Sequence, residues 1–299
     1  MNLLEKKDAV RTAKVFRAAR KQKGFSQLEL SKKLSITQGT LSKIELGKLS
    51  VSSSIWYEFC NLTDLQPEWA WGLGVVDRPE MKNKITSDQV GSFSLPEKYR
   101  LNRGTPVRSI RALLGYFSSV YGEKKLNEYM ERIGVDPDYF LVLSNQININ
   151  FSLDTFEVLA ADGRLKPENL KMIANAYSNP TFHGALAGRF HTTGPEVHEN
   201  LLTDLIRNVG HYDMNFNYVI ESVQNGVVTI SIAPSEHLKA FNYKRGELGA
   251  ALCSYKQEIL KSFVTLGSGS SGVSPLAIEE RECHYKGAPR CLFHVRILN

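Results

Sequence analysis

The sequence lacks the features that mark secreted, membrane-spanning and catalytic proteins. Its 299 residues include only four scattered cysteines, too few for a disulfide scaffold. No apolar run approaches the ~20 residues that span a bilayer, and no charged-then-apolar leader opens the chain. It has no G-x-S-x-G, H-E-x-x-H, Walker or dinucleotide motif. We therefore expect a cytoplasmic protein with reduced thiols, no membrane partner and no enzymatic activity.

Positive charge is concentrated at one end of the chain. The net charge is +6. Residues 1–75 hold twelve Lys or Arg against seven Asp or Glu, a balance of +5, which leaves +1 for the remainder. A basic N-terminal region beside a nearly neutral body suits contact with nucleic-acid phosphates.

Residues 25–49 predict two helices joined by a tight turn. Ser26 and Glu29 have the spacing of a capping box at the start of the first helix. Thr37 is the expected cap of the second, and Gly47 ends it. The apolar residues expected to face inward are Leu28, Leu30, Leu34, Leu41 and Ile44.

The outward face of the second predicted helix carries Gln38, Gly39, Thr40 and Lys43. Amide and hydroxyl side chains can bond base edges in a major groove, and lysine can pair with phosphate. For two helices in isolation, the solvated face of an ordinary helical hairpin is an equal alternative.

Residues 9–75 resemble the Cro/repressor-type (XRE) helix-turn-helix family. The matching features are a basic first helix, S-Q-x-E-L-S-x-x-L in the second and T-Q-x-T-L-S-K-I-E-x-G in the third. The resemblance implies a five-helix domain that binds a double-stranded DNA operator, as a homodimer on paired half-sites. It also implies that Glu45 pairs with Arg17 or Arg20. The implied DNA-binding residues are Gln27, Thr37, Gln38, Gly39, Thr40, Ser42 and Lys43.

The sequence predicts three regions: a DNA-binding domain at 1–75, a linker at 76–105 and a sensory domain at 106–299. The linker is rich in polar and chain-breaking residues and carries several basic ones, either solvated or touching DNA. In the third region, helical periodicity gives way to strand-like runs flanking Asn225-Gly226, a strong hairpin signal. A helix at about 246–264 and strands at about 276–285 and 291–297 follow.

The predicted fold class is therefore a mainly α helix-turn-helix domain plus an α+β domain with an antiparallel sheet. Several aromatic residues in the helical half could line a ligand cavity, although ordinary core packing is the more common role at helical spacing. They are Tyr116, Phe117, Tyr121, Tyr129, Tyr139 and Phe140.

The C-terminal hairpin resembles the end of the 4-vinyl-reductase-like small-molecule-binding domain family. The family pattern E-x-x-C-x-x-x-G-x-x-x-C-x-F is matched by Glu280, Cys283, Gly287, Cys291 and Phe293. Upstream, residues 246–249 fit the family's G-x-x-G. The resemblance implies a ligand-sensing domain, usually dimeric, with an apolar pocket between helices and sheet.

Some relatives in that family hold a structural zinc ion with the paired cysteines. The resemblance therefore implies Cys283 and Cys291 as zinc ligands, and the chemistry is plausible because thiolates bind zinc well. Those relatives carry a further cysteine before G-x-x-G, where this chain has residues 241–243 without one, so Cys253 is the available substitute. His211, His237, His284 and Glu280 are the candidates for a fourth ligand. The alternative is two reduced cysteines packed in a hairpin.

A haem sensor would need an axial histidine, and His183 and His191 are the candidates. Neither lies in a haem motif, so a surface or hydrogen-bonded role is favoured for both.

The sequence as a whole predicts a transcription regulator whose C-terminal domain senses a small apolar or aromatic effector. A C-terminal domain that docks a partner protein is the main alternative, and an enzyme with a regulatory DNA-binding domain is a weaker one.

Overall fold

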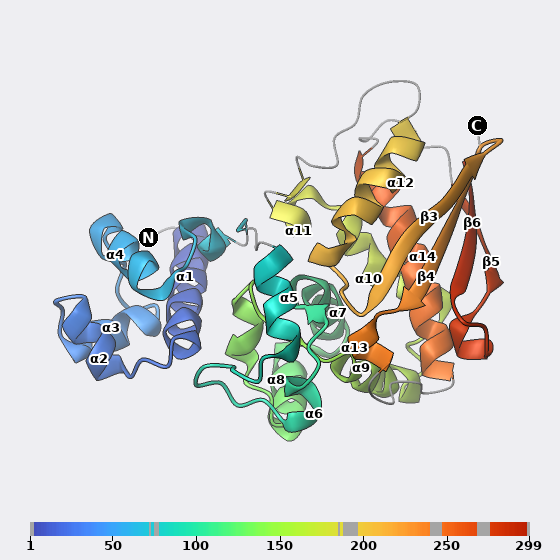
Figure 1. Cartoon of the computed structure of the whole chain (residues 1–299). Coiled ribbons are helices and arrows are strands. Elements are labelled where there is room, and N and C mark those ends of the chain that lie inside the picture. The colour runs from blue at the N-terminus through green and yellow to red at the C-terminus, as the bar shows by residue number, and fades with distance from the viewer. Residues whose placement is uncertain are drawn as a thin grey trace.

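A computed structural model describes the chain as helices in its N-terminal and middle parts and a four-stranded sheet at its C-terminal end (Figure 1). The described residues are 3–71, 73–74, 78–184, 186–187, 197–239, 247–267 and 276–297. This arrangement confirms the predicted fold class, a helical helix-turn-helix region followed by an α+β region with an antiparallel sheet.

The N-terminal region contains α1 (Leu3–Gln22), α2 (Gln27–Lys33), α3 (Gln38–Glu45), α4 (Ser53–Thr63) and η1 (Pro67–Trp71). The predicted caps are present: Ser26 and Glu29 form a capping box, and the Thr37 hydroxyl accepts a bond from the Thr40 amide. Gly47 follows α3 with φ +67°, a conformation that glycine adopts without strain. The fifth helical element is a 3-10 helix rather than an α-helix.

Aromatic stacking forms the centre of this region. The rings of Phe16 and Phe59 stack with centroids 3.6 Å apart, and Trp56 packs against both. The prediction that Leu28 is buried was wrong, because its side chain is 50% exposed while Leu30 is fully buried. Residues two apart on a helix point roughly 200° apart, so the two leucines cannot share one face.

The described part of the segment predicted to be a linker (76–105), residues 78–105, folds onto the rest of the chain instead of remaining open. It contains α5 (Arg78–Thr86) and α6 (Glu97–Arg100), and it buries Phe93 and Tyr99. Arg103, one of the basic residues of this segment that were expected to be solvated or to touch DNA, is instead 1% exposed. It donates to the Tyr139 hydroxyl and to two backbone carbonyls. Burial in this segment depends on contacts with distant residues. It therefore leaves no periodic pattern of apolar residues in the sequence.

Helices fill the middle of the molecule. They are α7 (Val107–Tyr121), α8 (Glu123–Arg132), η2 (Pro137–Leu141), α9 (Asn150–Ala161), α10 (Pro167–Ala174), η3 (Asn175–Ser178), α11 (Pro180–His183), α12 (Val197–Asn208) and η5 (Val209–His211). A short antiparallel pair, β1 (Thr105–Pro106) with β2 (Gln146–Ile147), ties the start of α7 to the chain before α9.

The sheet has the order β3-β4-β6-β5, and all neighbours are antiparallel. Its strands are β3 (Phe216–Gln224), β4 (Val227–Pro234), β5 (Leu276–Glu282) and β6 (Cys291–Ile297), and α13 (Glu236–Lys239), α14 (Glu247–Gly267) and η6 (His284–Lys286) connect them. Asn225 and Gly226 both have positive φ, which confirms the predicted hairpin turn.

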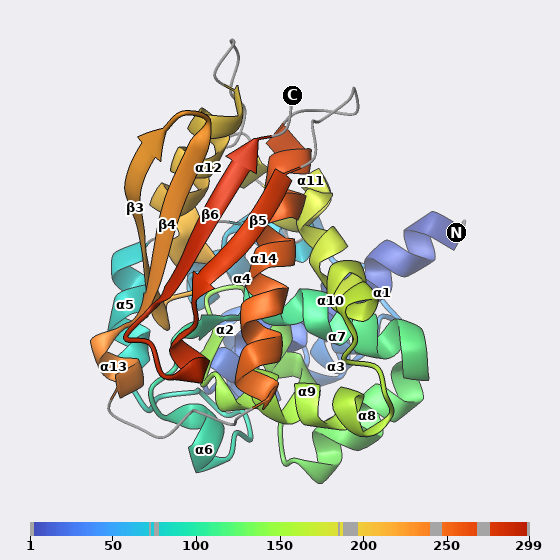
Figure 2. The same cartoon turned by 90° about the vertical axis from the view of Figure 1, so that its right-hand side faces the viewer.

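Helices α12 and α14 cover one face of the sheet, and Figures 1 and 2 show no described helix over the other face. Side chains that point to the helix-covered face are buried, and side chains that point to the other face are more exposed. Ile230 of β4 and Phe293 of β6 are paired and fully buried, whereas Val219 and Val223 of β3 are 50% and 44% exposed. The candidate cavity described below therefore lies on the helix-covered side.

Helix α1 belongs to the helix-turn-helix region and also contacts the middle of the molecule. Arg17 donates two hydrogen bonds to the Asp138 carboxylate, at 2.6 and 2.8 Å, and Lys21 pairs with Asp136 at 2.6 Å. The Lys21 carbonyl accepts bonds from the backbone and hydroxyl of Ser92. Side chains and backbone of one helix thus join the helix-turn-helix region to the rest.

Replacing Asp138 by asparagine should weaken this junction. The Asp138 side chain is 8% exposed but that of Arg17 is 37% exposed, so solvent screens part of the attraction. We expect Asp138→Asn to lower the free energy of unfolding by about 1–2 kcal/mol. Urea unfolding followed by circular dichroism measures this, with Glu131→Gln on the exposed side of α8 as the control. Equal stability of the two variants would contradict the structural role of the ion pair.

Candidate functional site

Helix α3 presents a polar face to solvent and an apolar face to the domain core. Leu41 and Ile44 are 0% and 1% exposed, whereas Gln38 and Lys43 are exposed. The inward face fixes the helix against α1 and α2, which leaves the outward side chains projecting from a rigid support. A rigidly held polar helix face is what reading of a DNA groove requires.

A buried ion pair sets the position of α3 relative to α1. Arg20 donates to both oxygens of Glu45, at 2.6 and 3.0 Å, and also to the Phe25 carbonyl. Of the two arginines proposed as partners of Glu45, the structure therefore selects Arg20, since Arg17 pairs with Asp138 instead.

All seven sequence-predicted DNA-binding residues lie on α2, on α3 or at the start of α3. They are Gln27, Thr37, Gln38, Gly39, Thr40, Ser42 and Lys43. Thr37, Gln38, Gly39 and Lys43 are exposed, and the other three are half-buried. The Gln27 amide donates to Glu45 at 2.9 Å, and the hydroxyls of Thr37 and Thr40 are bonded to each other.

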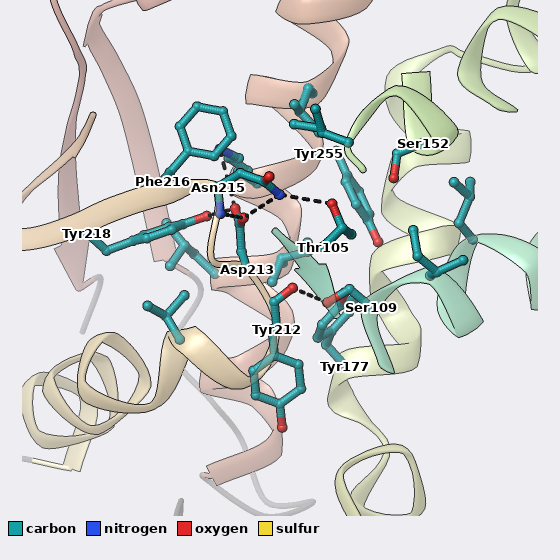
Figure 3. A pocket seen from close by; sticks show the side chains of 18 of the residues that line it. Thr105, Ser109, Ser152, Tyr177, Tyr212, Asp213, Asn215, Phe216, Tyr218 and Tyr255 are labelled. Atoms are coloured by element: carbon teal, nitrogen blue, oxygen red, sulfur yellow. Dashed lines mark hydrogen bonds and ion pairs between the residues drawn. The ribbon is translucent and has the colours of Figure 1, made fainter. Parts of the chain in front are cut away.

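A cavity with a free volume of about 80 Å³ lies between α7, α9, α12, α14 and β3 (Figure 3). Most of its wall is apolar. The apolar and aromatic lining residues include Ile110, Leu113, Phe156, Leu205, Phe216, Leu252, Ile259, Leu260 and Phe263. Side chains from elements far apart in the sequence therefore line one small space.

One side of the cavity wall is polar. The Asp213 carboxylate accepts a bond from the Tyr218 hydroxyl at 2.7 Å and lies 3.6 Å from the Lys256 ammonium. The Asn215 amide donates to Asp213 and to the Thr105 hydroxyl, as Figure 3 shows. Its carbonyl oxygen is buried without a hydrogen-bond partner. A ligand group in the cavity would meet this network.

Burial perturbs the ionisable groups of this polar wall. Desolvation lowers the pKa of Lys256, and the nearby Asp213 carboxylate opposes the shift. The pKa of Tyr218 is raised well above its usual value, first by burial and then by the charge of Asp213. The Lys256 ammonium also lies 3.0 Å from the centre of the Phe216 ring.

The sequence did not identify these cavity residues. None of the six aromatic residues named from the helical half lines the cavity; Tyr116, Phe117, Tyr129, Tyr139 and Phe140 are buried in the core instead. One signal was available: Lys256 is a charged residue whose neighbours one turn away, Leu252, Ile259 and Leu260, are all apolar. A lysine at the centre of an apolar helix face is expensive to bury unless a partner is present.

Three cysteines and one glutamate converge where α14 meets the C-terminal hairpin. The ligand atoms of Cys253, Glu280, Cys283 and Cys291 all lie within 4.8 Å of one another. The Cys253 sulfur is 3.4 Å from that of Cys291 and 3.9 Å from that of Cys283. Sulfurs bound to one tetrahedral zinc at ~2.3 Å lie roughly 3.8 Å apart. The donor set and spacing therefore fit a zinc ion.

Glu280 supplies the fourth donor among the described residues. Its Oε1 atom is buried and has no hydrogen-bond partner. The histidines that the sequence offered, His211, His237 and His284, are not part of this four-residue group. The hydrogen bond between Cys253 and Cys291 lowers the pKa of Cys291, which favours the thiolate that a metal requires, and raises the pKa of Cys253. Burial raises the pKa of Cys283.

Close packing positions this group. A Cβ atom on Gly249 of α14 would lie 2.0 Å from the Tyr285 ring, so only glycine allows the hairpin to approach the helix this closely. The glycine of the G-x-x-G pattern thus has a packing function, and the first glycine, Gly246, lies outside the described residues.

His183 is a buried, hydrogen-bonded residue. One ring nitrogen lies 2.5 Å from the Tyr212 hydroxyl and the other 2.7 Å from the Tyr177 carbonyl. Burial lowers the pKa of His183 to about 4, so the ring is neutral at pH 7. With both nitrogens occupied it offers no axial ligand, and His191 lies outside the described residues.

Comparison with known proteins identifies the N-terminal region. Residues 16–69 match the family model described as Helix-turn-helix. The N-terminal region is thus the helix-turn-helix of a DNA-binding transcription regulator. No helix in the described part of the chain is long and apolar enough to cross a membrane.

No curated protein matches the chain. Among solved structures, a crystal structure of an H-NOX protein from S. oneidensis in the Fe(II)NO ligation state is similar, with 12% identity and a TM-score of 0.48. The match covers 65% of this chain and 99% of that one. Similarity at this level supports no inference about a cofactor here.

Proposed function

We propose that the chain is a one-component transcription regulator in the cytoplasm, whose α+β region binds a small apolar or aromatic effector and thereby controls operator binding. The observation that carries the proposal is the cavity itself, because it combines an apolar wall with one buried polar network. A protein-docking domain would instead need a large exposed apolar patch.

The size of the cavity limits the effector and suggests how it acts. A volume of about 80 Å³ is smaller than the ~150 Å³ apolar cavity that takes up benzene. An effector with one aromatic ring must therefore displace part of the wall. Its apolar body would contact Phe156 and Phe263, and a polar group would reach Asp213, Asn215 or Lys256. Binding alters operator affinity only if the displaced arrangement binds DNA differently.

The DNA-binding region would transmit that change through α1. The contacts of Arg17 with Asp138 and of Lys21 with Asp136 join α1 to η2, which is adjacent to α7 in the fold. Helix α7 carries Ser109 and Ile110 of the cavity wall. In this proposal the regulator acts as a homodimer, since two half-sites double the contacts that one α3 makes.

The α+β region would be a 4-vinyl-reductase-like domain with a structural zinc ion. Cys253, Glu280, Cys283 and Cys291 would hold the ion, which would clamp the C-terminal hairpin to α14. Because α14 also forms part of the cavity wall, the clamp would fix one side of the effector site. The buried, unpartnered oxygen of Glu280 supports this assignment.

Two substitutions on α3 test DNA recognition. An operator sequence would first be selected from random DNA with the wild-type protein. Lys43→Ala should weaken binding to all sequences and reduce the salt slope by about one. Gln38→Ala should relax specificity at one base pair, reducing the free energy of discrimination against the wrong base by about 1–3 kcal/mol. The control is Lys124→Ala, an exposed lysine on α8. If a variant with both Lys43→Ala and Gln38→Ala keeps sequence-specific binding, α3 is not the helix that contacts the bases.

Filling the cavity tests effector binding. Native mass spectrometry of the purified protein would report retained organic mass, and a thermal-shift panel of single-ring alcohols, amines and acids would supply probes. A binder at 100 times its Kd should stabilise the wild type by about 2.7 kcal/mol. Ser152→Phe, which places a ring in the cavity, should abolish that shift, whereas Ser254→Phe on the exposed side of α14 should not. Equal shifts in both variants would place the site elsewhere.

Metal analysis tests the thiol cluster. We expect one zinc ion per chain by elemental analysis, and chelation should lower the unfolding temperature. Cys283→Ser should lose the zinc, whereas Cys60→Ser, a buried cysteine of the N-terminal core, should retain it. A zinc-free wild type that is as stable with chelator as without would refute a structural metal.

A further inference from the structure

A second pocket lies between α1 and α7, apart from the apolar cavity. Its volume is about 300 Å³, within the range of ligand sites. The helix-turn-helix region contributes Arg11, and the middle of the molecule contributes the rest of the lining: Arg108, Arg111, Ala176, Asn179, Thr181 and Phe182. We name it the arginine pocket.

Three arginines line the arginine pocket without any acidic residue. Arg108 is fixed, because it is 6% exposed and donates to the carbonyls of Phe182 at 2.9 Å and Gly74 at 2.7 Å. Both partners are neutral, so its charge is not compensated. Within the described side chains, Arg11 and Arg111 have no hydrogen bond or ion pair.

The three like charges repel one another, although water screens part of the repulsion because Arg11 and Arg111 are exposed. Although part of Arg111 is exposed, exclusion of water from its guanidinium and, to a smaller extent, the charges of Arg11 and Arg108 together lower its pKa to about 10. By contrast, Arg17 and Arg20 on the same helix α1 as Arg11 are paired with Asp138 and Glu45. An anion of matching charge would remove the repulsion.

We propose that the arginine pocket binds a small phosphate-bearing ligand. Phosphate carries more than one negative charge and accepts the paired bonds that a guanidinium fork donates, which suits Arg11 and Arg111. Arg108 supplies a third, immobile positive charge. The Asn179 carbonyl oxygen is already bonded to the Thr181 amide, so the amide nitrogen of Asn179 remains as a further donor.

Operator DNA is not the expected occupant. Figure 1 shows α2 and α3 on the opposite side of α1 from α7, so DNA on α3 lies away from the arginine pocket. A bound phosphate would instead bridge Arg11 of the DNA-binding region and Arg111 of α7. It would thereby strengthen the junction that the α1–η2 ion pairs already make. The proposal goes beyond effector sensing in the apolar cavity and does not depend on it.

Isothermal titration with inorganic pyrophosphate tests the proposal. The full-length protein would be titrated with pyrophosphate in chloride buffer. A parallel titration would use sulfate at equal ionic strength. We expect one saturable site, weakened at least about tenfold by Arg111→Ala or Arg11→Ala. Arg111→Lys keeps the positive charge but loses the paired donors of the guanidinium, so it should weaken pyrophosphate binding less than Arg111→Ala does. Arg164→Ala, at an exposed position outside the pocket, should leave it unchanged.

Three results would overturn the proposal. One is the absence of saturable pyrophosphate binding to a wild type whose folding is verified by circular dichroism. Another is an equal loss of affinity in the Arg164→Ala control, which would indicate a nonspecific charge effect. The third is an Arg11 or Arg111 variant that binds pyrophosphate normally but loses affinity for DNA, which would assign the arginines to the DNA backbone.

Discussion

The contact between α1 and η2 is the constraint on which the arrangement of this molecule depends. Helix α1 forms the core of the helix-turn-helix region through Phe16 and positions α3 through Arg20 and Glu45. The same helix bonds to Asp136 and Asp138 of the middle region. Because one rigid helix makes both sets of contacts, α3 cannot turn relative to the middle region unless charged, partly buried bonds break.

Helix α14 has a comparable double role at the other end. One stretch of it lines the apolar cavity through Leu252, Lys256 and Phe263, and Cys253 on the same helix meets the C-terminal hairpin. A ligand in the cavity and a metal in the thiol cluster would therefore act on one helix. The two sites are adjacent in the fold although the residues that form them come from distant parts of the chain.

Sequence reasoning was reliable where the signal is local. The Ser26 and Thr37 caps, the Asn225-Gly226 turn and the exposed polar face of α3 all follow from short-range bonding and helical periodicity. It failed where burial depends on distant partners. Leu28 projects to solvent despite its position beside a buried leucine, and the segment containing Tyr99 and Arg103 is packed although its composition resembles a linker. Lys256, the charged residue of the cavity wall, was not identified.

The sequence by itself determined the helix-turn-helix, the α+β class and the cysteines that form the thiol cluster, because capping, periodicity and motif spacing act within a few residues. Only the tertiary structure decided which arginine pairs with Glu45, that Glu280 joins the cysteines, and that Asp213 faces Lys256. It also brought Arg11 together with Arg108 and Arg111. These pairings form between elements that fold against one another, and their energy depends on distance and burial, which no local pattern encodes.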